Sequence, residues 1–471
     1  MSADRRRFLK SVALGSGGLL AGAVGVNAMA PWIWPERVPL DSNSSFWARS
    51  QAPPNAPLSK DLTVDVAVIG GGLTGLSSAY YIRSLSPEKS VAVLEAKGCG
   101  NGASGRNGAM VLTMTADRFM SFSDDPHVDK EIYDLTAGNV RSLARLSASE
   151  DIDCDLDAVG TVQVCNSEAD AGAARAYVAR AASLGMPVEY WDRERLGGAI
   201  GSDVYRGGYF DPNGGHVNPM KLVRVFKSAA ERAGVSVYEN TVVEHVDEGR
   251  VHALRTREGH LVRAKSLVLA CNAFAANLGY FGNSILPLRE YVGMTRPLSE
   301  EELGALGWHS RAPFNDSRTE VFYFGLTQDR RVHIGGGIPQ YNFNNAAPAQ
   351  GDVEAHRWKL ASELVRVFPT LAGVELEVMW SGIIDWSLNA APSVGIKGKY
   401  RNVFYGMGYS GHGVNLTSVF GRIIADLEAG RIEQWQRFPF VNSGFDYVPN
   451  EPFRWAAAKA GVLWYSLTER E

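Results

Sequence analysis

The stretch spanning residues 64–95 constrains the fold of this 471-residue chain more than any other. It opens with β-branched and apolar residues, Val64 to Ile69, as a buried parallel strand requires. Three glycines at GxGxxG spacing follow, namely Gly70, Gly72 and Gly75. Glycines at this spacing allow a tight turn, the close approach of a diphosphate and close packing of a helix on the strand.

A helix is predicted from about Leu73 to Leu85, and a second strand from Val91 to Leu94. The amides and the dipole at the start of this helix would favour a diphosphate. The second strand ends in Glu95, about 20 residues beyond the last glycine, where a carboxylate accepts hydrogen bonds from ribose hydroxyls. Strand, turn, helix and acid together predict a dinucleotide-binding βαβ unit.

Composition excludes several classes of protein. The formal net charge of −4 offers no basic footprint for nucleic acid. The four cysteines, Cys99, Cys154, Cys165 and Cys271, have no CxxC or His/Cys clustering, so neither a metal site nor a disulfide framework is predicted. An apolar fraction of 45% indicates a globular protein, and the length suggests two or three structural units.

The N-terminus is predicted to be a targeting segment. The string RRRFLK at residues 5–10 resembles the twin-arginine export signal, and Ala28-Met29-Ala30 has the form of a cleavage site. We therefore expect export by the twin-arginine translocase to the periplasm. An uncleaved anchor, with Trp32 and Trp34 at a membrane interface, is the alternative. Residues 31–60 are expected to be a linker or arm.

The segment GASGRNGA, after GGGLTGLSSAYYI, resembles the glycine and D-amino acid oxidase superfamily of FAD enzymes, most closely its gamma-glutamylputrescine oxidase-like branch. The resemblance extends from about residue 45 to the C-terminus. A later segment matches a motif of that branch at Trp380, Gly382, Asp385, Asn389 and Pro392. The resemblance implies an α/β fold with a Rossmann-like FAD-binding domain and an antiparallel-sheet substrate domain, each discontinuous in sequence.

The expected domain division follows from the same resemblance. The FAD-binding domain would take residues 61–150, 213–275 and 395–435. The substrate domain would take residues 151–212 and 276–394, where short strands rich in aromatic and β-branched residues predict a large sheet. Residues 436–471 would form a C-terminal tail with one helix.

The motif and the resemblance together name the residues expected at FAD. They are Gly70, Gly72, Leu73, Thr74, Gly75, Glu95, Ala96, Ala103, Ser104, Arg106, Asn107, Gly108, Val242, Val243, Ala270, Gly382, Gly408, Gly411, His412, Gly413 and Val414.

A second GxGxxG, at Gly406, Gly408 and Gly411, does not predict a second nucleotide site. The helix after it ends near Gly430 without a following strand that carries an acid. We expect this turn to face the flavin ring instead, as the resemblance also implies. A hydrolase elbow, GxSxG, is excluded because His412 stands where its second glycine is required.

The expected catalytic residues are His333, His412 and Tyr323, although a lone histidine is more often structural. His333 occupies the place where sarcosine oxidases carry a lysine used for oxygen activation. Gly382 stands about where those enzymes attach flavin to a cysteine, so dissociable, non-covalent FAD is expected. Asn415 replaces their lysine for the substrate carboxylate, which favours an amine over a small amino acid. Tyr291, Tyr323, Trp386 and Tyr409 are expected to line the substrate pocket, or else to be core.

The sequence therefore predicts an exported flavin amine oxidase. FAD would oxidise the C–N bond of an amine or amino-acid-like substrate, the imine would hydrolyse to an aldehyde or keto product, and O2 would be the acceptor. A periplasmic dehydrogenase that passes electrons to a quinone or cytochrome is an alternative, and so is a flavin-binding protein without turnover. The oligomeric state is left open.

Overall fold

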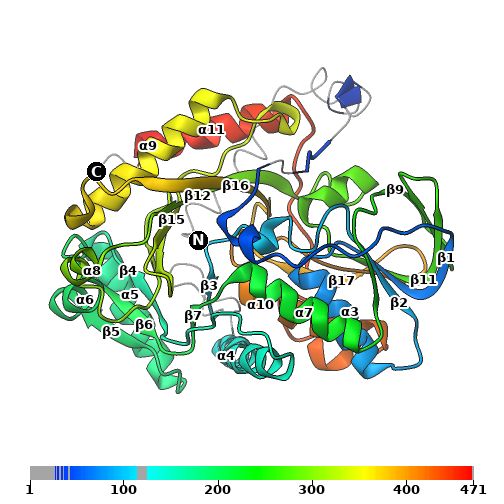
Figure 1. Ribbon diagram of the computed structural model, residues 1–471, viewed down its shortest axis with the longest axis horizontal. Coiled ribbons are helices and arrows are strands. Elements are labelled where there is room, and N and C mark those ends of the chain that lie inside the picture. Colours follow the sequence, from blue (N-terminus) through cyan, green and yellow to red (C-terminus); the bar gives the residue numbers. More distant parts are fainter. Residues whose placement is uncertain are drawn as a thin grey trace.

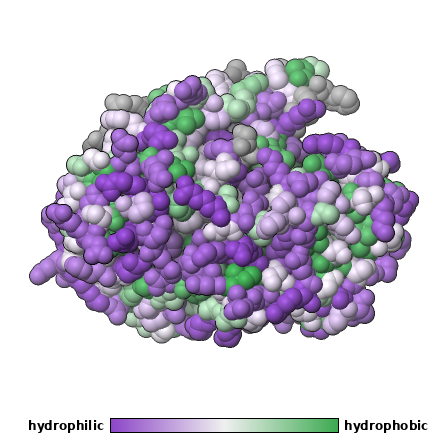
Figure 2. Space-filling model, in the orientation of Figure 1, coloured by the Kyte–Doolittle hydropathy of each residue, from purple (hydrophilic) through white to green (hydrophobic). Residues whose placement is uncertain are grey.

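The computed structural model describes residues 27, 29–30, 33–34, 37–40, 43–113, 123 and 125–468. The predicted export signal lies almost wholly outside these residues. Two large sheets organise the described chain, with helices packed on both (Figure 1). Hydrophilic residues cover most of the face drawn in Figure 2, and apolar residues form separate patches on it.

The first sheet is the predicted nucleotide-binding sheet, with the order β17-β18-β11-β1-β2-β8 and with β9 and β10 appended to β11. Its strands are β1 (Leu62–Ile69), β2 (Val91–Leu94), β8 (Ser236–Tyr238), β9 (Val243–Asp247), β10 (His252–Thr256), β11 (Leu261–Leu269), β17 (Ser393–Lys397) and β18 (Val403–Met407). β1 pairs in parallel with both β2 and β11, and β11 with β18. Such pairing buries both faces of a strand, which explains the continuous apolar run of β1.

Helices α3 (Leu73–Leu85), α7 (Pro219–Arg232) and α10 (Gly413–Glu428) lie together against this sheet (Figure 1). Their buried residues share one core with α4 (Pro126–Ser149). α7 begins as a capped helix should, with Pro219 in its first turn and the Asn218 side chain accepting from the Lys221 N–H at 3.1 Å.

The second sheet has the order β16-β12-β15-β14-β13-β4-β6-β5. Its strands are β4 (Thr161–Val164), β5 (Glu189–Asp192), β6 (Gly207–Asp211), β12 (Leu286–Thr295), β13 (Phe314–Asp316), β14 (Phe322–Leu326), β15 (Val332–Gly336) and β16 (Leu376–Trp386). The pairing is antiparallel, as predicted, apart from the parallel pair β13 and β4. A small ribbon, β3 (Met110–Val111) with β7 (Gly215–His216), lies between the two sheets (Figure 1).

The remaining helices surround the second sheet. They are α5 (Glu168–Ser183), α6 (Arg193–Ile200), α8 (Glu300–Leu306), α9 (Gln350–Val367) and α11 (Phe453–Thr468). α9 and α11 lie side by side above β12 and β16 (Figure 1). A search of the described residues finds no helix with the length and apolar character needed to span a bilayer.

The long ribbon of β12 and β16 positions the site. Its register pairs Leu286 with Trp386, Leu288 with Ile384 and Glu290 with Gly382. Because side chains alternate along a strand, these residues share one face of the ribbon, whereas Tyr291 lies on the other.

Candidate active site

A cavity of about 770 Å³, the cofactor cavity, lies where β1 and β11 end and α3 begins. Gly70 has φ of +109°, and a Cβ added there would lie 2.4 Å from the carbonyl oxygen of Ala270. Only glycine therefore fits between the two strand ends. Gly72 starts α3 without a side-chain cap, so the first amides of the helix remain suited to an anionic group.

Glu95 completes this end of the cavity. Its carboxylate accepts from the Gly71 N–H at 2.7 Å and from the Lys97 N–H at 2.9 Å. Burial raises the pKa of Glu95, and these two bonds act against that shift. A carboxylate accepts more than two hydrogen bonds, so ribose hydroxyls can be bound in addition. The Ser104 hydroxyl accepts from the Leu73 N–H at 2.9 Å and thereby fixes the following loop on α3. Glycine turn, helix terminus and acid fit FAD.

The second glycine turn also lines the cofactor cavity. The Asp385 carboxylate accepts from the N–H groups of Gly408 at 2.8 Å and Tyr409 at 3.2 Å. Burial raises the pKa of Asp385 to about 7. The Tyr409 hydroxyl lies 2.8 Å from the Thr74 hydroxyl, which joins this turn to the start of α3. The acid of the branch motif therefore holds the turn in place.

A second cavity of about 210 Å³, the acidic cavity, adjoins the first. The two cavities share Ala103, Asn107, Ile384, Gly411 and Val414. Three carboxyl groups line the acidic cavity, those of Asp211, Glu290 and Asp316.

Glu290 is the least compensated of the three acids. It projects from β12 opposite Gly382, which has no side chain to cover it. Among the described residues its carboxyl group has neither a hydrogen-bond partner nor an ion-pair partner. Burial raises the pKa of Glu290 to about 7. A half-buried carboxyl group without a partner favours a cationic ligand, which would restore its charged form.

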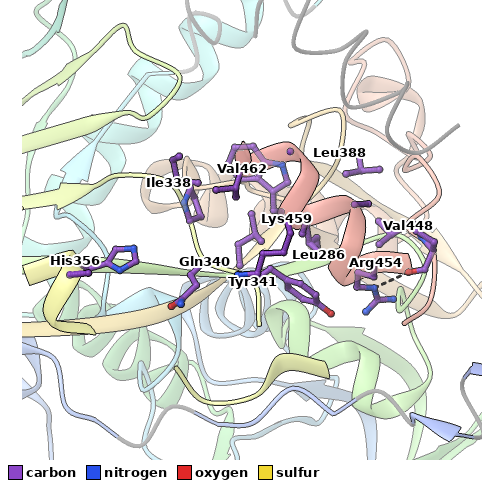
Figure 3. A pocket seen from close by; sticks show the side chains of 18 of the residues that line it. Leu286, Ile338, Gln340, Tyr341, His356, Leu388, Val448, Arg454, Lys459 and Val462 are labelled. Carbon is purple, nitrogen blue, oxygen red and sulfur yellow. Dashed lines mark hydrogen bonds between the residues drawn. The ribbon is translucent and has the colours of Figure 1, made fainter. Parts of the chain in front are cut away.

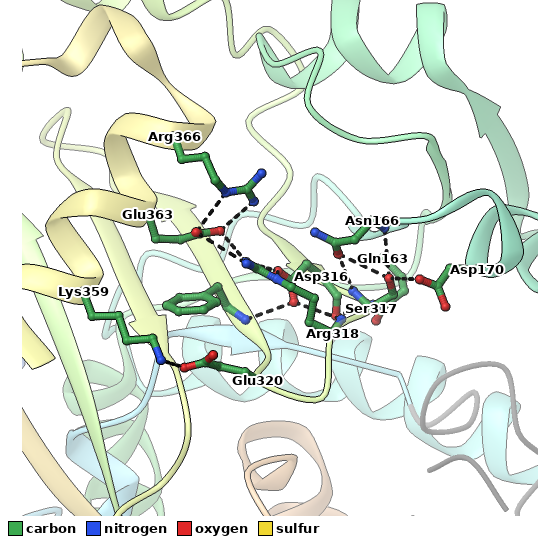
Figure 4. Close-up of polar contacts among 11 residues, drawn as sticks. Gln163, Asn166, Asp170, Asp316, Ser317, Arg318, Glu320, Lys359, Glu363 and Arg366 are labelled. Carbon is green, nitrogen blue, oxygen red and sulfur yellow. Dashed lines mark hydrogen bonds and ion pairs between the residues drawn. The ribbon is translucent and has the colours of Figure 1, made fainter. Parts of the chain in front are cut away.

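The other two acids have partners. Asp211 accepts from the Tyr133 hydroxyl at 2.9 Å, from the Asn213 N–H at 2.9 Å and from the Thr113 hydroxyl. These donors are neutral, and burial raises the pKa of Asp211. Asp316 is paired with Arg318, which also contacts Glu363 (Figure 4). Burial raises the pKa of Asp316 to about 6 despite Arg318.

Arg106 is the single Lys or Arg side chain among the described residues that line the acidic cavity. Its Nε donates to the Asn101 carbonyl at 2.5 Å, and its Nη atoms donate to the Ser381 carbonyl at 3.0 Å and to Asn43. The Arg106 carbonyl in turn accepts from the Trp380 indole at 2.8 Å. Arg106 therefore fixes the loop, and its donors are used within the protein.

The cofactor cavity collects most of the residues expected at FAD. They are Gly70, Gly72, Leu73, Thr74, Glu95, Ala96, Ala103, Ser104, Asn107, Val242, Val243, Ala270, Gly411, Gly413 and Val414. Arg106, Gly108, Gly382 and the exposed His412 line the acidic cavity instead.

Two expected cofactor residues line neither cavity. Gly75 packs α3 on the first strand, since a Cβ there would lie 1.9 Å from the Gly70 carbonyl oxygen. Gly408, with φ of +74°, shapes the second turn and donates to Asp385. Both glycines therefore shape the cofactor cavity through the backbone without lining it, and their contact with FAD stays a prediction.

The structure places His333, expected to be catalytic, behind the site. Its ring is 0% exposed and lines neither cavity, and its Nε2 lies 3.1 Å from Nε2 of His216. Burial lowers the pKa of His333 well below its usual value and that of His216 to about 4, so both rings are neutral. The ring of Trp47 packs against both.

The four aromatic residues expected at the substrate fall into three groups. Tyr323 and Trp386 line the acidic cavity. Tyr323 fits between Gly108 and Gly335, where an added Cβ would lie within 2.2 Å of its ring atoms, and burial raises its pKa well above the usual value. Tyr409 lines the cofactor cavity instead. Tyr291 lines none: it stacks on His356 at 4.2 Å and donates to Gln340.

Glu290 was not predicted from the sequence. The signal was its position within the alternation Leu286, Leu288, Glu290, Val292, where one acid interrupts an apolar face. A charged residue on the buried face of a strand is more informative than an aromatic one.

Comparisons with known proteins agree with this geometry. The DAO family model, described as FAD dependent oxidoreductase, matches residues 65–427. Gamma-glutamylputrescine oxidoreductase of Escherichia coli (strain K12) is 29% identical over 91% of this chain and 99% of its own length. Glycine oxidase of Geobacillus kaustophilus is 24% identical over 80% of this chain and 96% of its own.

Solved structures share the fold. The crystal structure of glycine oxidase from Geobacillus kaustophilus superposes with a TM-score of 0.68 at 22% identity, covering 81% of this chain and 98% of that chain. L-proline dehydrogenase from P. horikoshii gives a TM-score of 0.66 at 17% identity, covering 81% and 96%. The family match over residues 65–427 shows that the chain belongs to the DAO family of FAD-dependent oxidoreductases, and its cofactor is FAD.

Proposed function

We propose that this enzyme oxidises the C–N bond of a cationic amine held in the acidic cavity by Glu290. The product is an imine that hydrolyses to an aldehyde or ketone, and O2 is the acceptor. The observation that carries the proposal is the Glu290 carboxyl group, which lines the cavity next to the cofactor cavity without a partner among the described residues. A small amino acid would instead need a free cation for its carboxylate, and the donors of Arg106 are engaged by the protein.

The residues of the chain have separable tasks in this reaction. FAD, when bound, accepts two electrons and the hydrogen from the carbon next to nitrogen. Glu290, with its pKa raised to about 7, binds the ammonium group and takes its proton, which leaves the neutral amine that is oxidised. Gly108 lets the Tyr323 ring pack against the backbone of the loop, and Gly382, opposite Glu290 on the neighbouring strand, presents no side chain to the cavity. The neutral phenol of Tyr323 forms a wall that excludes water.

Non-covalent attachment of FAD follows from Gly382 and from the state of the cysteines. Gly382 offers no nucleophile at the cavity. Cys271, which lines the cofactor cavity, has its pKa raised to about 12 by burial and is therefore a thiol, not a thiolate. Denaturation with acid should release all of the flavin into the supernatant, whereas a coloured protein pellet would contradict this proposal.

The site is tested by anaerobic mixing of the FAD-loaded enzyme with a panel of alkylamines, diamines and amino acids. We expect alkylamines or diamines to bleach the visible flavin absorbance. Glu290→Gln should lower the limiting rate constant of bleaching at least tenfold and shift its pH profile. Glu354→Gln, an exposed acid on α9, serves as the matched control and should behave as wild type. Bleaching by amino acids alone would contradict the proposal.

The string RRRFLK at residues 5–10 supports a periplasmic location. We propose that residues 1–30 direct the folded, FAD-loaded chain through the twin-arginine translocase. Replacement of Arg5 and Arg6 together by lysine should retain the flavoprotein in the cytoplasmic fraction. Cleavage after Ala30 would give a soluble periplasmic protein, and retention of residues 1–30 would give one anchored at the inner membrane. An unaltered distribution of the double variant would contradict export by this route.

A further inference from the structure

A third cavity, the apolar cavity, is lined by the ribbon of β12 and β16, by α9 and by α11 (Figure 3). Its volume is about 400 Å³, within the range of small-molecule sites. Aliphatic and aromatic side chains form most of its wall. They include Leu286, Leu288, Ile338, Trp386, Leu388 and Val462.

The apolar cavity adjoins the acidic cavity, since Pro339 and Trp386 line both. Leu288 and Glu290 lie two positions apart on the same face of β12, a separation of about 7 Å along a strand. A molecule in the apolar cavity is therefore one side chain away from the space that adjoins the cofactor cavity. This adjacency to the site of the cofactor points to electron transfer as the role of an apolar molecule bound there.

The polar groups around the apolar cavity are mostly engaged. Lys359 is paired with Glu320 (Figure 4), and Arg454 donates to the carbonyls of Pro449 and Gly282. Gln340 donates to Asp352 and accepts from Tyr291. The cavity thus offers little to an amine and favours an uncharged ring or chain.

The surface next to the cavity is apolar as well. On α11, Leu463 is 61% exposed and Val462, which also lines the cavity, is 37% exposed. Trp455 of the same helix packs on Phe343, which packs on Trp34, so the N-terminal arm lies beside α11. In that arm Ile33 is 55% exposed. A ligand that partitions into lipid would meet an apolar approach on this side.

We propose that the apolar cavity binds a lipophilic quinone, with its ring against Trp386 and its chain toward Val462, and that this quinone is a second acceptor beside O2. The quinone accepts two electrons and one proton from the reduced cofactor and one proton from solvent, and leaves as the hydroquinone. Lys459, exposed on α11 and directed toward the cavity, supplies a hydrogen-bond donor for a quinone carbonyl (Figure 3). The electron supply rests on the proposed function, whereas the binding site does not.

Binding is tested by equilibrium dialysis of decylubiquinone against the oxidised, FAD-loaded protein. Ala458→Trp places an indole in the apolar cavity, because Ala458 lines it. Ala456→Trp places the same group on the exposed side of the same helix and is the matched control. We expect Ala458→Trp to raise the dissociation constant at least tenfold and Ala456→Trp to leave it unchanged.

Electron transfer is tested by reducing the flavin with dithionite, so that no amine is needed, and mixing it anaerobically with decylubiquinone. The rate of flavin reoxidation should saturate with quinone concentration in wild type and be at least tenfold lower in Ala458→Trp. The rates at which O2 reoxidises the two proteins should agree within twofold. Leu288→Phe, a smaller filling change, should slow reoxidation by quinone in the same direction if Ala458→Trp fails to fold.

Two results would overturn the proposal. The first has two parts: dodecanoate displaces decylubiquinone from the wild-type protein at an equal concentration, and the reduced wild-type flavin reacts with quinone no faster than that of Ala458→Trp. Together they would identify the cavity as a lipid site. The other is that quinone binds equally well to Ala458→Trp and Ala456→Trp. Failure of every amine to bleach the flavin would instead remove the proposed function and leave this test standing.

Discussion

Two neighbouring parts of one strand face carry different side chains. Leu286 and Leu288, at the start of β12, line the apolar cavity and form the apolar part, whereas Glu290, in the middle of the strand, lines the acidic cavity and forms the acidic part. The pairing of β12 with β16 continues across both parts. We infer that an aliphatic-to-acid change within two positions separates a site suited to uncharged molecules from one suited to cations, with Trp386 at the border.

The largest effect on turnover is expected when the acidic part of the strand face is made like the apolar part. Glu290→Leu removes the carboxyl group proposed to bind the ammonium. We expect kcat/KM for amines to fall roughly a hundredfold, which corresponds to a loss of about 3 kcal/mol of transition-state stabilisation. Steady-state kinetics with the amine that bleaches the flavin fastest gives this value. Glu375→Leu, the same change at an exposed acid, is the control. A loss of kcat/KM smaller than threefold would show that the acidic and apolar parts do not differ in the proposed way.

The pH dependence of amine binding sharpens the comparison. Burial raises the pKa of Glu290 to about 7, so the free protein keeps the carboxyl group neutral below that pH. Relative to the unfolded chain, the ligand-free folded protein favours the protonated form of Glu290. The contribution of Glu290 to the free energy of unfolding is therefore fully present below the pKa of the unfolded chain, and it is lost as the pH rises through about 7. A bound ammonium compensates the carboxylate, so affinity for an unreactive amine should rise about tenfold from pH 5.5 to 8.5. Calorimetric titration should show no such rise in Glu290→Gln; a flat wild-type profile would contradict the assignment.

Removal of the Trp386 side chain, which lines both cavities, should join the acidic cavity to the apolar cavity. Trp386→Ala opens the acidic cavity toward the apolar one, so kcat/KM for a benzylic amine should rise about fivefold relative to kcat/KM for a linear amine, which corresponds to roughly 1 kcal/mol. Unfolding free energy should also fall by about 2 kcal/mol, less than for a fully buried tryptophan. Ratios of kcat/KM for the two amines measure the first effect. An unchanged ratio would mean that Trp386 does not limit the substrate space.

The smallest effect on turnover is expected at His333, behind the site. His333→Asn leaves both cavities untouched, so kcat should remain within twofold, while the lost contact with His216 should lower the unfolding free energy by about 1–2 kcal/mol. Thermal unfolding and steady-state kinetics on the same preparation separate the two effects. A tenfold loss of kcat at unchanged stability would return His333 to the catalytic role expected from the sequence.

The nucleotide-binding unit could be predicted from the sequence because its signals are local. The helix from Leu73 to Leu85 and the strand from Val91 to Leu94 have the predicted bounds, and the acid after them binds the glycine turn. Strand, turn and helix follow one another within about 30 residues, so a window of that length contains the whole motif.

The substrate side could not be predicted in the same way, because it depends on strand register. Choosing Tyr291 in place of Glu290 is an error of one position, and on a strand that error selects the opposite face. The face is decided by pairing of β12 with β16, which lies some 90 residues later in the chain. The position of His333 could not be predicted for a related reason, because its side chain packs against Trp47 and lines neither the cofactor cavity nor the acidic cavity.

The most direct test is a crystal structure of the FAD-loaded enzyme with tert-butylamine, which has no hydrogen on the carbon next to nitrogen and cannot be oxidised. We predict the FAD diphosphate on the turn of Gly70 to Gly75, and the ammonium nitrogen at hydrogen-bond distance, about 2.8 Å, from the Glu290 carboxylate. An ammonium bound elsewhere, with Glu290 unoccupied, would contradict the account.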